Sequence, residues 1–126
     1  TALLSWSRPY INGAPPAPRV GHTAIVIGTK LYVIGGAAFG RVLGDLHVLD
    51  VGRELWWRVH ASGKYARARM AHAAIRIGWD VLFFGGMPPN DDGSIGGSVP
   101  TTVPLGQTPT PSRTRTRYLV RGNPSL

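Results

Sequence analysis

The chain has 126 residues, a length typical of one small domain, and 43% of them are apolar. Gly (17) and Pro (11) together exceed a fifth of the chain, which favours many turns and short strands over long helices. The absence of Cys excludes disulfides, thiolate metal sites and a cysteine nucleophile. The net charge of +8 is spread along the chain, so it predicts a weak general attraction to polyanions and no particular binding site.

The N-terminal residues carry no targeting signal. TALLSW lacks the basic start and the long apolar stretch of a signal peptide, and no run approaches the roughly 18–20 apolar residues of a membrane span. Small secreted domains also commonly contain disulfides. We therefore expect a cytoplasmic location and no membrane partner. Because the chain does not begin with Met, we interpret it as a piece of something longer.

A 50-residue internal repeat organises most of the sequence. Sliding the chain by 50 positions, without a gap, matches Trp6 with Trp56, Arg19 with Arg69, His22 with His72, and Gly35-Gly36 with Gly85-Gly86. Positions between these matches are alike in kind, as in LYVI against VLFF. Self-similarity at such a period indicates a repeat architecture, in which each unit is one supersecondary structure.

Residues 1–12 come before the first complete unit. Because Trp6 takes the position of Trp56, we interpret residues 1–12 as the last strand of a preceding unit. GHTAIVIG (21–28) and KLYVIGG (30–36) are apolar on both faces and predict two buried strands. The IGTK turn between them fits a type II′ hairpin with Gly28 at its first central position.

Two further strands complete the unit. DLHVLDV (45–51) predicts the third, and LWWRVHA (55–61) predicts a fourth whose polar residues on one face suit an outer strand. Residues 71–86 then repeat the first two strands, with IGWD at the turn. No segment keeps a helical period, so we predict no helix. Four short strands in about 50 residues form the meander typical of a propeller blade.

The order of these features resembles a kelch repeat. The matching features are Gly21-His22, the Gly-Gly pair, the Asp45-Leu46 opening of the third strand and the later Trp56, and the resemblance covers roughly residues 1–86. It implies an all-β fold, a kelch-type β-propeller fragment with about one complete four-stranded blade plus parts of two neighbours. Because propellers usually need about four to eight blades, we expect that further blades are missing or supplied by another chain.

The resemblance also implies a structural role for the repeated residues. They are Trp6, Arg19, His22, Gly35, Gly36, Asp45, Trp56, Arg69, His72, Gly85 and Gly86. A metal site is the alternative for the paired histidines, but zinc needs three or four converging ligands and no Cys or acidic residue repeats beside them. We expect these two histidines to hydrogen-bond backbone within the sheet, and His47 and His60 to face solvent. Most of the aromatic residues, Trp6, Trp56, Trp57, Tyr32, Phe83 and Phe84, are expected to form core between blades.

Residues 87–126 depart from the repeat. Shifting by 50 finds no third strand there, and Pro, Thr, Ser, Gly and Arg dominate, which is typical of a disordered tail. The basic segment SRTRTRYLVR (112–121) has the charge to touch nucleic acid or an acidic partner, but four Arg make a weak patch and a solvated tail is the simpler interpretation. Nucleic acid is therefore not a favoured partner.

No catalytic constellation is visible. Asp91 and Asp92 are adjacent carboxylates in a Gly/Pro-rich segment, without a partner residue for acid–base chemistry. Some proteins with kelch-like propellers are oxidases with a copper centre that contains a Cys-modified Tyr, and a chain without Cys cannot form it. We predict no catalytic residues, no metal and no cofactor.

Function in repeat proteins concentrates in loops. In a four-stranded meander, residues 37–44 and the blade connection 61–69 lie at the same end, beside residues 12–18. This loop face offers Phe39, Arg41, Lys64, Tyr65 and Arg67, and aromatic and Arg side chains are common interface anchors. The sequence thus predicts a non-catalytic protein–protein interaction module that binds an acidic peptide or protein partner. The alternatives are ordinary loop residues, part of an enzyme whose active site lies on absent blades, and a nonfunctional truncated copy.

Overall fold

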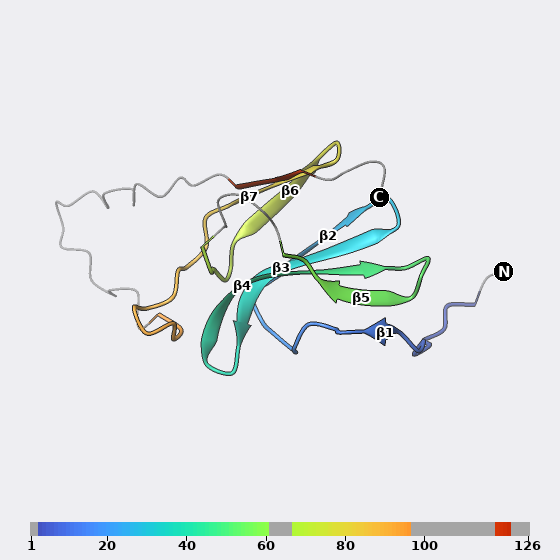
Figure 1. Ribbon diagram of the computed structural model, residues 1–126, viewed down its shortest axis with the longest axis horizontal. Helices are drawn as coiled ribbons and strands as arrows, with labels where there is room; N and C mark the ends of the chain where they lie inside the picture. Colours follow the sequence, from blue (N-terminus) through green and yellow to red (C-terminus); the bar gives the residue numbers. More distant parts are fainter. Residues whose placement is uncertain (1–2, 61–66, 97–117, 122–126) are drawn as a thin grey trace.

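The computed structural model describes residues 3–60, 67–96 and 118–121, and the described part of the chain contains strands and no helix (Figure 1). The strands are β1 (Asn12–Gly13), β2 (Thr23–Ile27), β3 (Lys30–Ala38), β4 (Arg41–Asp50), β5 (Leu55–Arg58), β6 (Ala73–Ile77), β7 (Asp80–Phe84) and β8 (Tyr118–Arg121). They form two sheets. We refer to β2–β5 as blade 1 and to β6–β8 as blade 2.

Blade 1 is a complete antiparallel meander. Its sheet has the order β1-β5-β4-β3-β2, in which β2 to β5 pair in sequence and β1 adds a short parallel contact to β5 at the outer edge. The prediction of one complete four-stranded blade is confirmed. Thr23 starts β2 and Ile27 ends it, so the predicted strand 21–28 is shortened at both ends, where Gly21 and Gly28 have positive φ.

The turns follow the sequence chemistry. Gly28 (φ +60°) and Gly78 (φ +61°) occupy the first position of two-residue turns, as the type II′ prediction requires. The β3–β4 connection is shorter than expected. Residues 37–44 were predicted as a loop, but β3 continues to Ala38 and β4 begins at Arg41. Only Phe39 (φ +52°) and Gly40 (φ +72°) form the turn, and positive φ at both positions is typical of type I′.

Blade 2 contains a strand that the repeat did not reveal. Its sheet has the order β6-β7-β8, and β8 pairs antiparallel with β7 from Phe83–Tyr118 to Asp80–Arg121. Shifting the sequence by 50 residues revealed no third strand for this blade. The reason is that β8 comes from residues 118–121, far beyond the position that the repeat spacing predicts. Without β8, the edge of β7 would expose a row of unpaired backbone donors and acceptors. Pairing with β8 gives these groups hydrogen-bond partners. The rest of the predicted tail, residues 97–117 and 122–126, lies outside the described residues.

The core lies between the two blades. Ile27 and Ile34 of blade 1 meet Val81 and Phe83 of blade 2, and all four side chains are buried. Partly buried apolar residues surround them, namely Ile25, Tyr32, Leu46 and Ala74. The pairing register explains the composition, because Ile25 lies opposite Tyr32 and alternate residues of each strand face the same side. Face-to-face packing of the blades thus buries apolar side chains of both sheets.

The segment before β1 does not behave as predicted. Residues 1–12 were expected to form the last strand of a preceding blade, with Trp6 in the core. Of the described residues 3–12, only Asn12 lies in a strand, the two-residue β1, and Trp6 is fully exposed (103%). No sheet lies beside this segment in the described chain, so it has neither a pairing edge nor an apolar face to cover (Figure 1). Phe84 is likewise exposed, whereas Phe83 is buried.

Candidate partner-binding site

A buried ion cluster lies where the segment that enters blade 1 meets β4. Arg19 donates to both carboxylate oxygens of Asp45, over 2.6 Å (Nη1 to Oδ1) and 3.0 Å (Nη2 to Oδ2). The other side of the carboxylate lies 2.9 Å (Oδ2) from His47 Nε2. The three side chains are 4%, 13% and 9% exposed, in the order Arg19, Asp45, His47. The expectation that His47 faces solvent is therefore wrong, because the i, i+2 spacing places it on the same face of β4 as Asp45.

The Asp45 carboxylate stays ionised at neutral pH. Burial acts to raise the pKa of Asp45, but the hydrogen bonds and charges of Arg19 and then His47 outweigh it, and the pKa lies below its ordinary value. Arg19 Nη1 also donates to the Gly35 carbonyl at 2.9 Å. The cluster thereby ties the entering segment to two strands of the blade, β3 and β4, and it serves structure.

The junction between the blades repeats this design in part. Arg69 Nη1 donates to the Gly85 carbonyl at 3.0 Å, as Arg19 does to Gly35 fifty residues earlier. The Arg69 guanidinium carbon lies 5.6 Å from the centre of the Phe83 ring, a cation–π distance. At the position of Asp45, the second repeat has Ile95.

The two repeated histidines differ from each other. His72 Nε2 lies 2.7 Å from the Thr23 hydroxyl of blade 1, so its partner is a side chain, where we expected backbone. Burial lowers the pKa of His72, and the nearby positive charges of Arg69 and His22 lower it further. His22 is exposed, because the described chain has no blade on that side for it to contact. His60 is exposed too.

The Gly-Gly pairs make room for backbone. A Cβ on Gly35 would lie 2.7 Å from the Arg69 carbonyl oxygen, and a Cβ on Gly36 would lie 2.8 Å from the Val20 carbonyl oxygen. Gly36 N–H donates to that same Arg69 carbonyl at 2.9 Å. In blade 2, Gly86 is equally crowded, whereas no atom of the described residues lies within 4 Å of a Cβ added at Gly85. The contact that Gly35 makes with the following blade has no counterpart at Gly85.

The β3–β4 turn and residues 88–96 form one end of blade 1. Val42 N–H donates to the Gly93 carbonyl and Ile95 N–H donates to the Gly40 carbonyl, each over 3.1 Å. Arg41 Nη2 donates to the Asp92 carbonyl at 3.2 Å. The Asp92 carboxylate accepts from Ser94 N–H at 2.8 Å, and its hydrogen bonds with Ser94 lower its pKa. A segment of the predicted tail is thus ordered against the blade.

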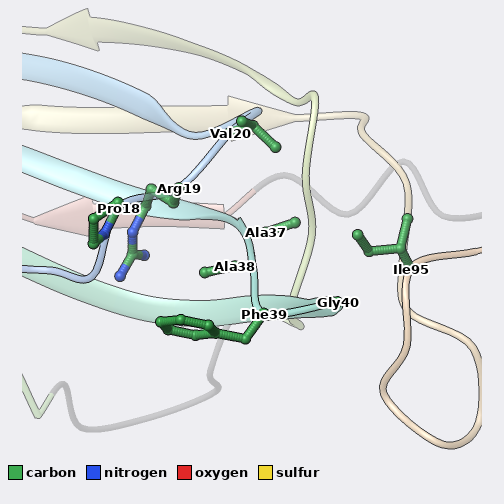
Figure 2. Close-up of a pocket in the computed structure, with 8 residues that line it drawn as sticks. All are labelled: Pro18, Arg19, Val20, Ala37, Ala38, Phe39, Gly40 and Ile95. Atoms are coloured by element: carbon green, nitrogen blue, oxygen red, sulfur yellow. The ribbon is translucent and has the colours of Figure 1, made fainter.

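A shallow pocket of about 440 Å³ lies at this end of blade 1 (Figure 2). Its lining residues are Pro18, Arg19, Val20, Ala37, Ala38, Phe39, Gly40 and Ile95. Figure 2 shows Ile95 on one side, Pro18 and Arg19 on the other, and the Phe39 ring along one edge. Apart from Arg19, the lining is apolar or glycine. Phe39 is 88% exposed, although it is aromatic and stands beside other apolar side chains.

Comparison with known proteins identifies the family. Residues 1–96, three quarters of the chain, match the KLHDC2/KLHL20/DRC7 Kelch-repeats domain. The chain belongs to the kelch-repeat family. Kelch domain-containing protein 1 of Mus musculus is 38% identical over 90 residues, which are 69% of this chain and 22% of that protein. The Rab9 effector protein with kelch motifs of Rattus norvegicus is 42% identical over 87 residues, 66% of this chain and 23% of that protein.

A third relative has a name of another kind. The tRNA wybutosine-synthesizing protein 2/3/4 of Oryza sativa subsp. japonica is 40% identical over 79 residues, 62% of this chain and 7% of that protein. The chain therefore spans between 7% and 23% of the length of these three relatives.

The loop residues predicted to bind a partner can be placed on this kelch blade. Phe39 lies in the β3–β4 turn, Arg41 follows it as the first residue of β4, and both are exposed. Arg67 is exposed as well, and its segment runs beside β4, because Arg69 N–H donates to the Leu43 carbonyl at 3.1 Å. The structure therefore brings both segments to the same blade. Lys64 and Tyr65 lie outside the described residues.

Sequence reasoning placed Pro18 correctly near this surface, since residues 12–18 were expected beside the loop face. It missed Ile95, which comes from residues assigned to the tail. The turn-forming NDDG sequence (90–93) before Ile95 was the one available signal, and it does not say where the turn docks.

Neither a metal centre nor a membrane span is found in the parts of the chain that the structure describes. Residues 3–60, 67–96 and 118–121 contain no group of three or more His, Cys, Asp or Glu side chains that could hold a metal ion. Within the same ranges, no helix is long and apolar enough to cross a membrane.

Proposed function

We propose that this chain is a non-catalytic kelch-repeat interaction module that binds an acidic peptide or protein segment at the Phe39 end of blade 1. Phe39 carries the proposal. The residue holds a left-handed backbone conformation (φ +52°) that Gly or Asn adopts at lower cost, and it keeps its ring in solvent. A strained backbone that displays an exposed aromatic side chain is a reason to infer a binding role.

The surroundings of Phe39 fit a mixed apolar and acidic ligand. The pocket beside it has room for an apolar side chain, and Arg41 adds an exposed guanidinium on the same strand pair. Arg67 adds a second positive charge on the neighbouring connection. An acidic segment with one apolar anchor residue would place its side chain in the pocket and its carboxylates near these Arg side chains.

The relatives give supporting context. One relative is named as a Rab9 effector protein with kelch motifs, a name that concerns a protein partner of that protein. This chain spans 23% of that relative, so the relative's name does not identify the partner of this chain. The acidic partner of this chain is part of the present proposal. Basic charge alone offers little selectivity, so the apolar pocket is the feature that would discriminate among acidic segments.

A second candidate is part of an enzyme whose active site lies on blades absent from this chain. The observation that favours it is the name of the rice relative, a tRNA wybutosine-synthesizing protein. This candidate predicts converging His, Tyr or acidic residues on additional blades in the source reading frame, and flanking sequence without such residues would count against it.

Fluorescence anisotropy with labelled acidic peptides tests the binding proposal. The peptides carry a central Leu or Phe between Glu residues, and a matched set has Gln in place of Glu. Phe39→Asn should weaken binding at least about tenfold while raising the unfolding free energy by about 1 kcal/mol, because Asn tolerates the positive φ better. If Phe39→Asn raises stability and leaves peptide binding unchanged, Phe39 is not part of the binding site.

Two arginine variants serve as a matched pair. Arg41→Gln should weaken binding of the Glu peptides and leave the Gln peptides unaffected. Arg53→Gln removes the same charge from the exposed β4–β5 turn at the opposite end of the blade and should leave both unchanged. Equal losses from both variants would mean that net charge alone attracts the peptides, and no binding to any peptide would overturn the proposal.

A further inference from the structure

The N-terminal segment has the sequence of a blade strand, and it joins no sheet in the part of the chain that the structure describes. By the 50-residue shift, Ser5–Arg8 correspond to β5 (Leu55–Arg58), with Trp6 at Trp56 and Arg8 at Arg58. In blade 1, β5 pairs along β4 as the fourth strand. Residues 3–8 of the N-terminal segment are all exposed, including the apolar Leu3, Leu4 and Trp6. A set of exposed apolar residues of this kind marks an interaction segment.

Among the described residues, blade 2 has no fourth strand of the kind that this segment would form. Its described strands end at β8, which occupies the place that β4 holds in blade 1. In blade 1, the far edge of β4 carries β5, whereas the described residues place no strand on the far edge of β8. Open sheet edges accept strands from other chains.

The outer face of blade 2 is apolar and open. Ile75 and Ile77 are 52% and 57% exposed, and Phe84 is exposed as well. Their counterparts in blade 1 are Ile25, Ile27 and Ile34, which blade 2 covers in the core. The empty space at Gly85 belongs to the same face, since the equivalent Gly35 receives the Arg69 carbonyl of the following blade. This face therefore has the chemistry of a blade junction.

The matching surface exists on the other side of blade 1. Ala24 is exposed there, and its counterpart Ala74 packs into the core between the blades. His22 is exposed too, whereas His72 reaches across the junction. Val26 is also exposed on this face. The surface that would dock on blade 2 is thus carried by the same chain.

We propose that copies of this chain associate head to tail, with residues 5–8 of one copy forming the fourth strand of blade 2 in another. This pairing would bring the Ala24 and Val26 face of the first copy over Ile75 and Ile77 of the second. The arrangement continues the interface that already joins blade 1 to blade 2 within the chain. The interface is heterologous, because the N-terminal side of one copy meets blade 2 of another. An open assembly therefore keeps one free N-terminal segment and one free blade 2 face at its ends, and it grows until these meet. It does not depend on the proposed acidic ligand.

Two sequence differences between the repeats make the junction between copies weaker than the junction between blades 1 and 2 within one chain. Val59 N–H donates to the Leu46 carbonyl at 2.8 Å, but the corresponding Pro9 has no N–H, so pairing ends at Arg8. Ala73 replaces Thr23 and gives His22 no hydroxyl partner. The charge of +8 on each copy adds repulsion that salt screens. Association should therefore be reversible, dependent on concentration and favoured by salt.

Sedimentation equilibrium of the whole chain measures this association. The average mass should exceed that of the 13.5 kDa monomer at high concentration and rise further when salt is added. Trp6→Ala and Ile75→Arg should each weaken association at least about tenfold. Tyr10→Ala, which removes an exposed aromatic residue beyond the paired segment, and Val51→Arg, which adds the same charge at the β4–β5 turn, should leave it unchanged.

A mixing experiment tests the head-to-tail geometry. Trp6→Ala retains an intact blade 2 face and Ile75→Arg retains an intact N-terminal segment. Each variant alone should be monomeric, and an equimolar mixture should form a dimer that grows no further. Far-UV circular dichroism of each variant checks that it is folded. A parent chain that stays monomeric at all concentrations overturns the proposal, as does a mixture of folded variants that stays monomeric.

Discussion

At the scale of single residues, the buried cluster of Arg19, Asp45 and His47 holds the entry to blade 1. Asp45→Asn keeps the side-chain shape but removes the charge that faces a buried guanidinium. Breaking a buried ion pair by removing one partner typically costs roughly 3 kcal/mol or more, so we expect a loss of this size in the unfolding free energy from urea titration. Arg53→Gln removes an exposed guanidinium that lies 3.8 Å from the buried Asp50 carboxylate. That carboxylate keeps its hydrogen bond from Arg53 N–H at 3.0 Å, so the substitution should cost less than about 1 kcal/mol. Equal costs would contradict the assigned role of the cluster.

A second prediction at this scale concerns pH and His72. Burial and then the charges of Arg69 and His22 hold the pKa of His72 below its ordinary value, so the folded state keeps the ring neutral. As pH falls below about 6.5, the unfolded chain takes up a proton at this residue before the folded chain does, and stability decreases. His72→Gln retains an amide for Thr23 and removes the titration. Its urea midpoint should fall less between pH 7.5 and 5.5 than the parent midpoint, while His60→Gln, at an exposed position, should behave as the parent does.

At the scale of elements, the two Gly-Gly endings offer a matched comparison. Gly35 and Gly85 have similar positive φ values, +62° and +74°, so substitution by Ala imposes a similar backbone strain at each. Only Gly35 is crowded, by the Arg69 carbonyl oxygen and the His72 ring. Gly35→Ala should therefore lower the unfolding free energy by at least about 1 kcal/mol more than Gly85→Ala, as measured by chemical denaturation. Equal losses would mean that strain alone explains both glycines.

The elements also show where sequence reasoning succeeds. Local turn chemistry and continuous apolar runs located β2, β3, β6 and β7 to within two residues, because Gly28 and Gly78 fix the hairpins and the registers follow. Reasoning failed where a partner lies far away in the sequence. β8 pairs across more than thirty residues, and no local pattern encodes that choice. His47 was placed in solvent because its hydrogen-bond contact with Asp45, which Arg19 also holds, depends on the fold.

The residues of the candidate site also divide into those that local sequence patterns predicted and those that depend on contacts distant in the sequence. Phe39 and Arg41 were named from the loop rule, yet the turn that holds them is two residues long because β3 and β4 extend beyond their predicted ends. Ile95 reaches the pocket only through the hydrogen bonds of residues 90–95 to the β3–β4 turn, which composition could not indicate. The strained φ of Phe39, the strongest argument for function, is a backbone property that becomes visible only in the structure.

At the scale of the whole molecule, one blade is complete and the other depends on a strand from the C-terminal region. A chain that ends at Gly96 would lose β8 and leave the β7 edge unpaired beside the central Val81 and Phe83. It would also lose four of fourteen basic residues and no acidic ones, which reduces the net charge that opposes aggregation. We expect the truncated chain to unfold at lower urea concentration and to aggregate more readily.

The control for this truncation keeps β8 and shortens the chain before it. Deleting residues 101–110 leaves Tyr118–Arg121 in place, removes no charged residue, and changes the loop-closure free energy by less than about 1 kcal/mol. This variant should match the parent in urea midpoint and in light scattering, whereas the chain ending at Gly96 should not. Leu119→Pro separates pairing from charge, because it removes a backbone N–H from the middle of β8 and keeps every arginine. If that variant is as stable as the parent, β8 contributes little to blade 2, and the fourth-strand position beside it loses its support.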